Sequence, residues 1–167
     1  MRARLVAKAL LATVVLPGVV AIAVPYSILR WSGSVTLPGL SPVTFFAAAW
    51  WAVSAVALLH SIWAFAAYGH GTLAPVDPPR VLVVRGLYRY TRNPMYLAVL
   101  SSLLAAALCF RSAALLLYAF ACGLCFHLFV LSYEEPALRA QFGASFERYA
   151  RAVPRWGITT RPYRYMD

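Results

Sequence analysis

The sequence predicts an all-α integral membrane protein with about four transmembrane helices, a tight hairpin of the last two, and a C-terminal amphipathic helix. Of the 167 residues, 62% are hydrophobic and only 12% are charged, which is far above the apolar fraction of a soluble domain. The apolar residues gather in four long runs, and the basic residues lie between and beyond these runs. This pattern is typical of helices that cross a bilayer.

The first predicted span covers residues 9–29, an uncharged run that follows a basic N-terminus. A cleaved signal peptide is the alternative, because Ala21-Ile22-Ala23 fits a small-x-small cleavage site. The apolar run continues past that site, which favours a retained helix. Pro17 and Pro25 would kink this helix, so we expect it to pack against other spans.

The second predicted span covers residues 43–68 and contains one ionisable residue, His60. An imidazole at this depth could carry a proton. A neutral imidazole that is hydrogen-bonded to a neighbouring helix is the simpler interpretation.

The third and fourth predicted spans cover residues 95–110 and 112–133, with only Arg111 between them. A short apolar run, one charge and a long apolar run predict a tight helical hairpin. This hairpin would bring the basic, tyrosine-rich stretch of residues 80–96 to the same membrane face as Glu134 and Glu135.

The charges predict the orientation of these spans. Thirteen of the fifteen lysines and arginines fall on one side of the membrane, and only Arg30 and Arg111 fall on the other. Because basic residues favour the cytoplasmic side, we expect both termini and the segments 69–94 and 134–156 to be cytoplasmic, in an inner or plasma membrane. The net charge of +10 therefore indicates membrane orientation rather than nucleic-acid binding.

The tail beyond residue 133 has the pattern of an amphipathic helix. Its apolar residues recur at intervals of three and four, whereas its arginines occupy other faces. Such a helix can lie on the anionic leaflet, act as a lid over a site at the membrane surface, or do both. The apolar positions are Leu138, Phe142, Phe146, Tyr149 and Val153.

Glu134 and Glu135 are two of only five acidic residues, and they follow an apolar span where desolvation is costly. A buried acid pair usually has a cationic partner. The partner is either a protein side chain, with Arg89 and Arg92 as candidates for a structural salt bridge, or a bound cation such as an ammonium or sulfonium.

Three tyrosines, Tyr88, Tyr90 and Tyr96, lie within nine residues of one another. Tyrosine rings attract cations, although a tyrosine at a membrane interface is also an ordinary anchor. Their density beside Arg92 favours a binding site.

No metal site is expected from the sequence. His60, His70 and His127 are far apart, and Cys122 and Cys125 form a CxxC without a second pair.

Several short motifs in a fixed order resemble the superfamily of isoprenylcysteine carboxyl methyltransferases and phospholipid methyltransferases, over roughly residues 69–156. The resemblance implies a single membrane methyltransferase domain, residues 1–167, that transfers a methyl group from S-adenosylmethionine to a lipophilic or lipid acceptor and releases S-adenosylhomocysteine. The motifs are Val81-Leu82-Val83, Gly86-Leu87-Tyr88, Arg92-Asn93-Pro94-Met95-Tyr96, Glu134-Glu135-Pro136, Phe142-Gly143 and Val153-Pro154-Arg155.

The resemblance also implies the cofactor contacts. Acids would hold the ammonium, tyrosine rings would face the sulfonium, and Asn93 with Arg92 would hold the carboxylate. Glu135 is the candidate base if the acceptor is an amine. The implied cofactor-binding residues are Arg80, Val81, Leu82, Val83, Tyr88, Arg92, Asn93, Pro94, Met95, Tyr96, Glu134 and Glu135, with a looser match at Gly69 and Gly71.

Two departures leave the acceptor and the methylated atom open, and the oligomeric state is open as well. The isoprenylcysteine branch has histidine where this chain has Asn93, and an arginine where it has Val130. A phospholipid amine N-methyltransferase is therefore an alternative. A non-catalytic membrane protein and a small proton-coupled transporter are alternatives from other classes.

Overall fold

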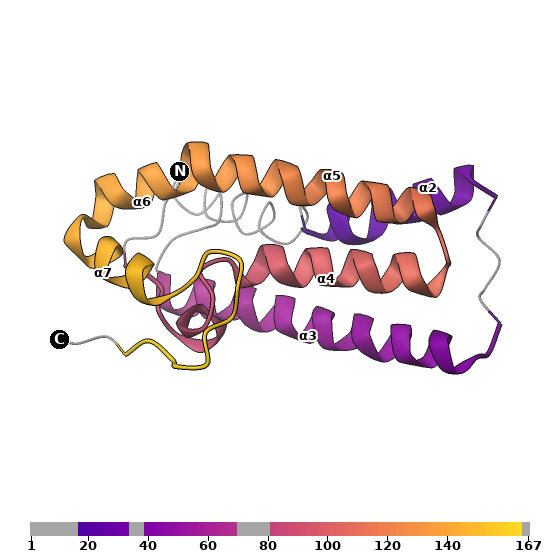
Figure 1. Ribbon diagram of the computed structural model, residues 1–167, viewed down its shortest axis with the longest axis horizontal. Helices are drawn as coiled ribbons and strands as arrows, with labels where there is room; N and C mark the ends of the chain where they lie inside the picture. Colours follow the sequence, from indigo (N-terminus) through magenta and orange to yellow (C-terminus); the bar gives the residue numbers. More distant parts are fainter. Residues whose placement is uncertain (1–16, 34–38, 70–80, 165–167) are drawn as a thin grey trace, which may run out of the picture.

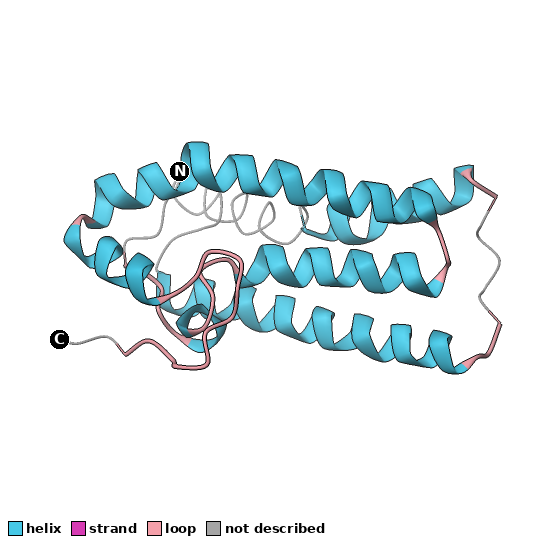
Figure 2. Cartoon of the chain, in the orientation of Figure 1, coloured by secondary structure: helices cyan, strands magenta, loops and turns pink. Residues whose placement is uncertain are grey.

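The computed structural model describes residues 17–33, 39–69 and 81–164, and all regular secondary structure within these ranges is helical, as Figure 2 shows. The predicted all-α class is therefore confirmed for the described residues. The elements are the π-helical turn η1 (Val19–Ala23), α2 (Val24–Trp31), α3 (Pro42–Gly69), the 3₁₀ turn η2 (Gly86–Arg89), α4 (Pro94–Cys109), α5 (Ala113–Phe129), the π-helical turn η3 (Val130–Glu134), α6 (Glu135–Phe142) and α7 (Ala144–Ala152).

Two helical runs are long and apolar enough to cross a membrane, namely α3 and the continuous run Ala113–Phe142. The predicted span 43–68 agrees closely with α3. Residues 9–16 of the first predicted span lie outside the described part of the chain, and its residues 19–29 belong to η1 and α2.

The helix that contains the last predicted span does not end at residue 133. The helix continues through η3 and α6 to Phe142, so Glu134 and Glu135 lie within a helical run rather than at its end. Pro136 lies in the first turn of α6, and the π-helical turn immediately before it absorbs the proline without ending the helix. The same order occurs at Pro25, which follows η1.

Helix α4 lies between α3 and α5 and connects to α5 through residues 110–112 (Figure 1). Ser101 on α4 accepts hydrogen bonds from Trp50 Nε1 and Ser54 Oγ of α3, both at 2.8 Å. Leu103 is fully buried in the middle of α4. Small and apolar side chains thus pack α4 tightly between its two neighbours.

The outer faces of the long helices carry large apolar side chains that are exposed. Exposed aromatic and aliphatic residues on this scale are unfavourable in water and typical of a surface that contacts lipid. They include Phe45, Phe46, Val53, Val56 and Leu59 on α3, and Leu116, Leu117, Phe120 and Leu124 on α5.

The C-terminal region differs from the predicted single amphipathic helix. It forms two helices, α6 and α7, which are separated at Gly143, where φ is +50°. The spacing of the apolar side chains at three and four residues continues across this break, so the sequence pattern does not reveal it. Positive φ is accessible to glycine at little cost, so the backbone can turn there.

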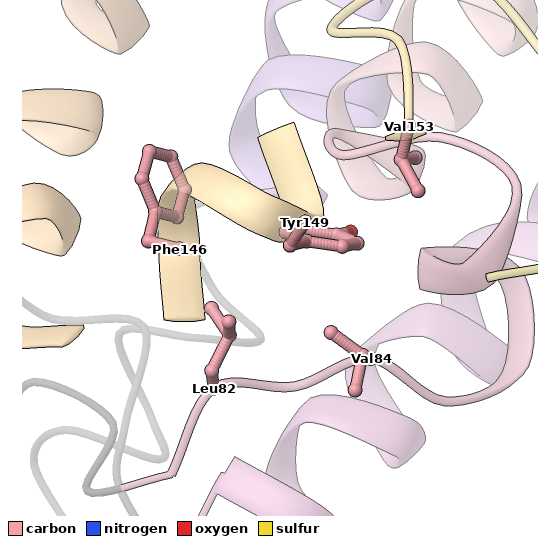
Figure 3. Packing of buried hydrophobic residues seen from close by; sticks show 5 residues of the cluster. All are labelled: Leu82, Val84, Phe146, Tyr149 and Val153. Atoms are coloured by element: carbon pink, nitrogen blue, oxygen red, sulfur yellow. The ribbon is translucent and has the colours of Figure 1, made fainter. Parts of the chain in front are cut away.

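The predicted apolar face of this region packs on the protein's own residues 81–84. Phe146, Tyr149 and Val153 form a buried cluster with Leu82 and Val84 (Figure 3). Leu138 and Phe142 pack against the same cluster. The face is thus used within the protein, and it fixes α6 and α7 over the segment that precedes α4.

Candidate functional site

The site is built on residues 81–93, the segment that leads into α4. Leu82 and Val84 pack on α7, whereas Val83 packs on Ala64 of α3 and on Met95. This alternation is what an extended backbone produces. The segment is therefore held between the end of α3 and the C-terminal helices (Figure 1).

The C-terminal segment is hydrogen-bonded along residues 88–93. Each of these bonds uses a backbone atom on at least one side, so they fix the path of both segments. They run from Tyr149 Oη to Tyr88 O (2.6 Å), Arg92 N to Pro154 O (3.0 Å), Asn93 Nδ2 to Arg155 O (3.2 Å), Thr159 N to Tyr90 O (2.9 Å) and Tyr163 N to Arg89 O (3.0 Å).

Glu135 is the centre of an ion-pair network. It is only 4% exposed, and its carboxylate accepts hydrogen bonds from Arg92 Nη1 at 2.9 Å and from Arg155 through both Nε and Nη2, the latter at 2.8 Å. Arg139 Nη2 lies 3.6 Å away. Of the two predicted protein partners, Arg92 pairs with this acid. Arg89 instead donates its Nε to Tyr163 O.

The two arginines that share Glu135 have different environments. Burial lowers the pKa of Arg92, and the charge of Glu135 opposes this shift. The hydrogen bond to Glu135 raises the pKa of Arg155. Both guanidinium groups stay charged at neutral pH, because an arginine pKa begins far above it.

Glu134 has a different environment from its neighbour. It accepts a hydrogen bond from Tyr96 Oη at 2.8 Å and forms no ion pair among the described residues. The Tyr96 ring stacks on Phe126, with centroids 4.7 Å apart, and lies 6.3 Å from the Trp156 ring. Glu134 is thus a carboxylate beside an aromatic wall.

Arg92 carries a buried hydrogen-bond donor that is not used within the described part of the chain. Its Nε is buried and has no hydrogen-bond partner among the described residues. A buried N–H without a partner is uncommon and needs an explanation, of which a ligand that accepts its proton is one. The atom belongs to the residue that also binds Glu135.

The structure places the predicted site residues in different surroundings. Arg92 pairs with Glu135, and Tyr96 donates to the adjacent Glu134. Val81 is 49% exposed, whereas Leu82, Val83, Tyr88 and Met95 are buried in the packing described above. Pro94 begins α4, and Gly69 ends α3 and accepts a hydrogen bond from Val81 N. Arg80 and Gly71 lie outside the described residues.

The sequence did not single out Arg155, Trp156 or His127 as members of this site. Trp156 Nε1 donates to His127 Nδ1 at 2.9 Å, which joins the C-terminal segment to α5. Only the Val153-Pro154-Arg155 motif pointed toward this region. Its spacing from Glu135 does not reveal the contact, because the chain turns back between α6 and α7. Among the described residues, no group of three or more His, Cys, Asp or Glu side chains is placed to hold a metal ion.

The family model for phospholipid methyltransferases matches residues 42–145, which is more than half of the chain. The chain belongs to this family. The resemblance found in the sequence is thereby confirmed at the level of the superfamily, and membership implies a membrane methyltransferase. The matched region begins with α3 and ends inside α7, so Arg155 and Trp156 lie beyond it. No curated protein and no solved structure is significantly similar to the chain.

Proposed function

We propose that this protein is an S-adenosylmethionine-dependent methyltransferase that acts on a lipophilic or lipid acceptor. The observation that carries the proposal is a set of groups around two adjacent acids in a member of this family. Within the described part of the chain, it combines a carboxylate without an ion pair at Glu134, an aromatic wall beside it, and a buried donor without a hydrogen-bond partner at Arg92 Nε.

The chemistry of these groups fits the methyl donor. The donor carries an ammonium, a sulfonium and a carboxylate. Glu134 would bind the ammonium, the rings of Tyr96 and Trp156 would face the sulfonium, and Arg92 Nε would bind the carboxylate. Asn93 gives one N–H to Arg155 O and keeps a second for the same carboxylate. The other predicted contacts among the described residues, from residues 81–83, Tyr88, Pro94 and Met95, would support the proposed donor site.

When bound, S-adenosylmethionine supplies a methyl group attached to a positively charged sulfur. The residues of the chain contribute orientation and the exclusion of water. Tyr96, Phe126 and Trp156 form the dry side of the site. A carboxylate acceptor needs no base, whereas an amine acceptor must first lose a proton.

The environment of Glu135 makes it unsuited to accept that proton. Glu135 is hydrogen-bonded to two arginines and paired with a third, so its oxygens are occupied. Glu134 accepts one hydrogen bond, from Tyr96, and its second oxygen is assigned to the ammonium of the donor. Glu135 would then be a residue that holds the site together.

We also propose that α4 and α5 cross the membrane as a hairpin, in a four-span protein with the site on the cytoplasmic face. Helix α4 has 16 residues, which gives a length of about 24 Å at 1.5 Å per residue. This is shorter than the usual hydrocarbon core, so the bilayer would thin locally or the flanking residues would adjust. Arg30 and Arg111 flank the opposite face, in agreement with the distribution of basic residues.

Isothermal titration with S-adenosylhomocysteine tests the donor site. Glu134→Gln removes the charge that would bind the ammonium, and we expect at least about tenfold weaker binding. Glu147→Gln is the matched control, because Glu147 is an exposed acid that pairs only with Arg139 among the described residues. Unchanged affinity of Glu134→Gln would remove Glu134 from the donor site.

Ligand-binding measurements on the wild-type protein in detergent distinguish an enzyme from a non-catalytic membrane protein. A protein that neither binds S-adenosylhomocysteine nor gains thermal stability at saturating concentrations has no methyl-donor site. For a protein that binds, transfer of a radiolabelled methyl group to extracted phospholipids and to a panel of lipophilic thiols, amines and carboxylates identifies the acceptor. The family match supports a phospholipid amine as the first candidate.

A further inference from the structure

Arg92 and Arg155 share one carboxylate unequally. Arg155 binds both oxygens of Glu135, through Nε to Oε1 and through Nη2 to Oε2. Arg92 gives a single N–H, from Nη1 to Oε1 at 2.9 Å. The side chain with the better geometry therefore belongs to the C-terminal segment, and Arg92 approaches the same acid with one donor only.

This unequal sharing explains the unused donor on Arg92. An arginine beside a carboxylate prefers a bidentate arrangement with two parallel hydrogen bonds. Arg92 would adopt that arrangement if both oxygens of Glu135 were available to it. Arg155 binds both of them, and Arg92 Nε stays buried without a hydrogen-bond partner in the described part of the chain.

The backbone around Arg155 holds this side chain in place. Pro154 O accepts a hydrogen bond from Arg92 N, and Arg155 O accepts one from Asn93 Nδ2. Val153, two residues earlier, is fixed in the buried cluster with Leu82 and Val84. Arg155 is thus anchored to the same segment as Arg92, the arginine with which it shares Glu135.

From this geometry we infer that Arg155 is a positioning residue: by occupying both oxygens of Glu135, it keeps Arg92 Nε free to bind the carboxylate of the methyl donor. Arg155 lies beyond the region that the family model matches. The inference rests on the proposed function. It adds that binding of the donor carboxylate requires the C-terminal segment.

Two ligands that differ only in the carboxylate test this role by isothermal titration. S-adenosylhomocysteine contains the carboxylate, and its decarboxylated analogue lacks it. For Arg155→Gln, Arg92 turns onto Glu135, and we expect about tenfold weaker binding of S-adenosylhomocysteine with less than about a twofold change for the analogue. Arg151→Gln, at an exposed arginine on α7, should change neither affinity.

A rescue variant tests the competition itself. The double variant Glu135→Gln/Arg155→Gln removes the carboxylate that would otherwise bind Arg92. It removes one negative and one positive charge together. We expect this double variant to bind S-adenosylhomocysteine at least about threefold more tightly than Arg155→Gln alone. Arg155→Lys, which keeps the charge but loses the two-donor fork, should show an intermediate loss for S-adenosylhomocysteine alone, and it replaces Arg155→Gln if that variant does not fold.

The outcomes separate the two proposals. Equal losses for both ligands indicate a merely structural role and overturn the inference, as does an unchanged affinity in Arg155→Gln or a double variant no better than the single one. If the wild-type protein binds neither ligand, the proposed function itself fails.

Discussion

The two ends of α4 are built in different ways. At its Pro94 end, the surrounding structure depends on groups far apart in the chain, such as Tyr149 Oη and Tyr88 O, which are 61 residues apart. At its Cys109 end, the connection to α5 is made locally, by Ser112 Oγ, which accepts a hydrogen bond from Leu115 N. The first end is sensitive to changes in distant segments, whereas the second is specified by neighbouring residues and apolar packing.

Glu135→Gln should have the largest effect, because the site end depends on this one charge. The change leaves Arg92, Arg139 and Arg155 without their shared counter-charge, and the loss of one partner of a buried ion pair costs about 3–5 kcal/mol. Chemical or thermal unfolding in detergent measures the loss. Glu147→Gln breaks an exposed pair with Arg139 and should cost less than about 1 kcal/mol. Equal losses would contradict the central role of Glu135.

Leu115→Ala tests whether the opposite end is independent of the site. Leu115 is fully buried and packs with Leu29 and Ala107, so we expect a loss of about 2–4 kcal/mol in the free energy of unfolding. The affinity of the folded protein for S-adenosylhomocysteine should stay within about twofold of the wild type. Leu117→Ala, at a residue that is 70% exposed, is the control and should change neither. A large loss of affinity in Leu115→Ala would show that the two ends are coupled.

The smallest losses of stability are expected when a single hydrogen bond is removed at either end of α4, and these two variants compare the ends directly. Tyr149→Phe leaves Tyr88 O without its buried donor, at a cost of about 1–3 kcal/mol. Ser112→Ala removes a helix cap, at a cost of about 1 kcal/mol. Hydrogen exchange should become faster at residues 88–93 in the first variant and at the start of α5 in the second. Faster exchange at residues 88–93 in Ser112→Ala would remove the distinction between the ends.

The sequence predicted the features that depend on composition and periodicity. The uncharged run 43–68 predicted α3 to within one residue at each end. The spacing from Leu138 to Val153 predicted the apolar face that packs in the C-terminal region. Both features depend on side-chain type at regular intervals, which a single sequence records directly.

The remaining features depend on backbone geometry and on the choice between equivalent partners. The bonds from Thr159 and Tyr163 to residues 89–90 use backbone atoms, so no side-chain pattern marks them. Gly143 breaks the helix without interrupting the apolar spacing. Arg92 and Arg155 are the same residue type, and only the folded chain shows which of them binds Glu135 with two donors.

The π-helical turn Val130–Glu134 separates chain length from direction in this helix. Each residue added to a regular α-helix rotates everything after it by about 100°, whereas a π-helical turn accommodates one additional residue within the turn itself. Removal of one residue from the turn would leave an α-helical turn, so the acid pair would keep its direction relative to α5, Tyr96 and the arginines. In an alignment of related chains, a single gap at this turn is therefore compatible with an unchanged site where every acid and arginine is retained.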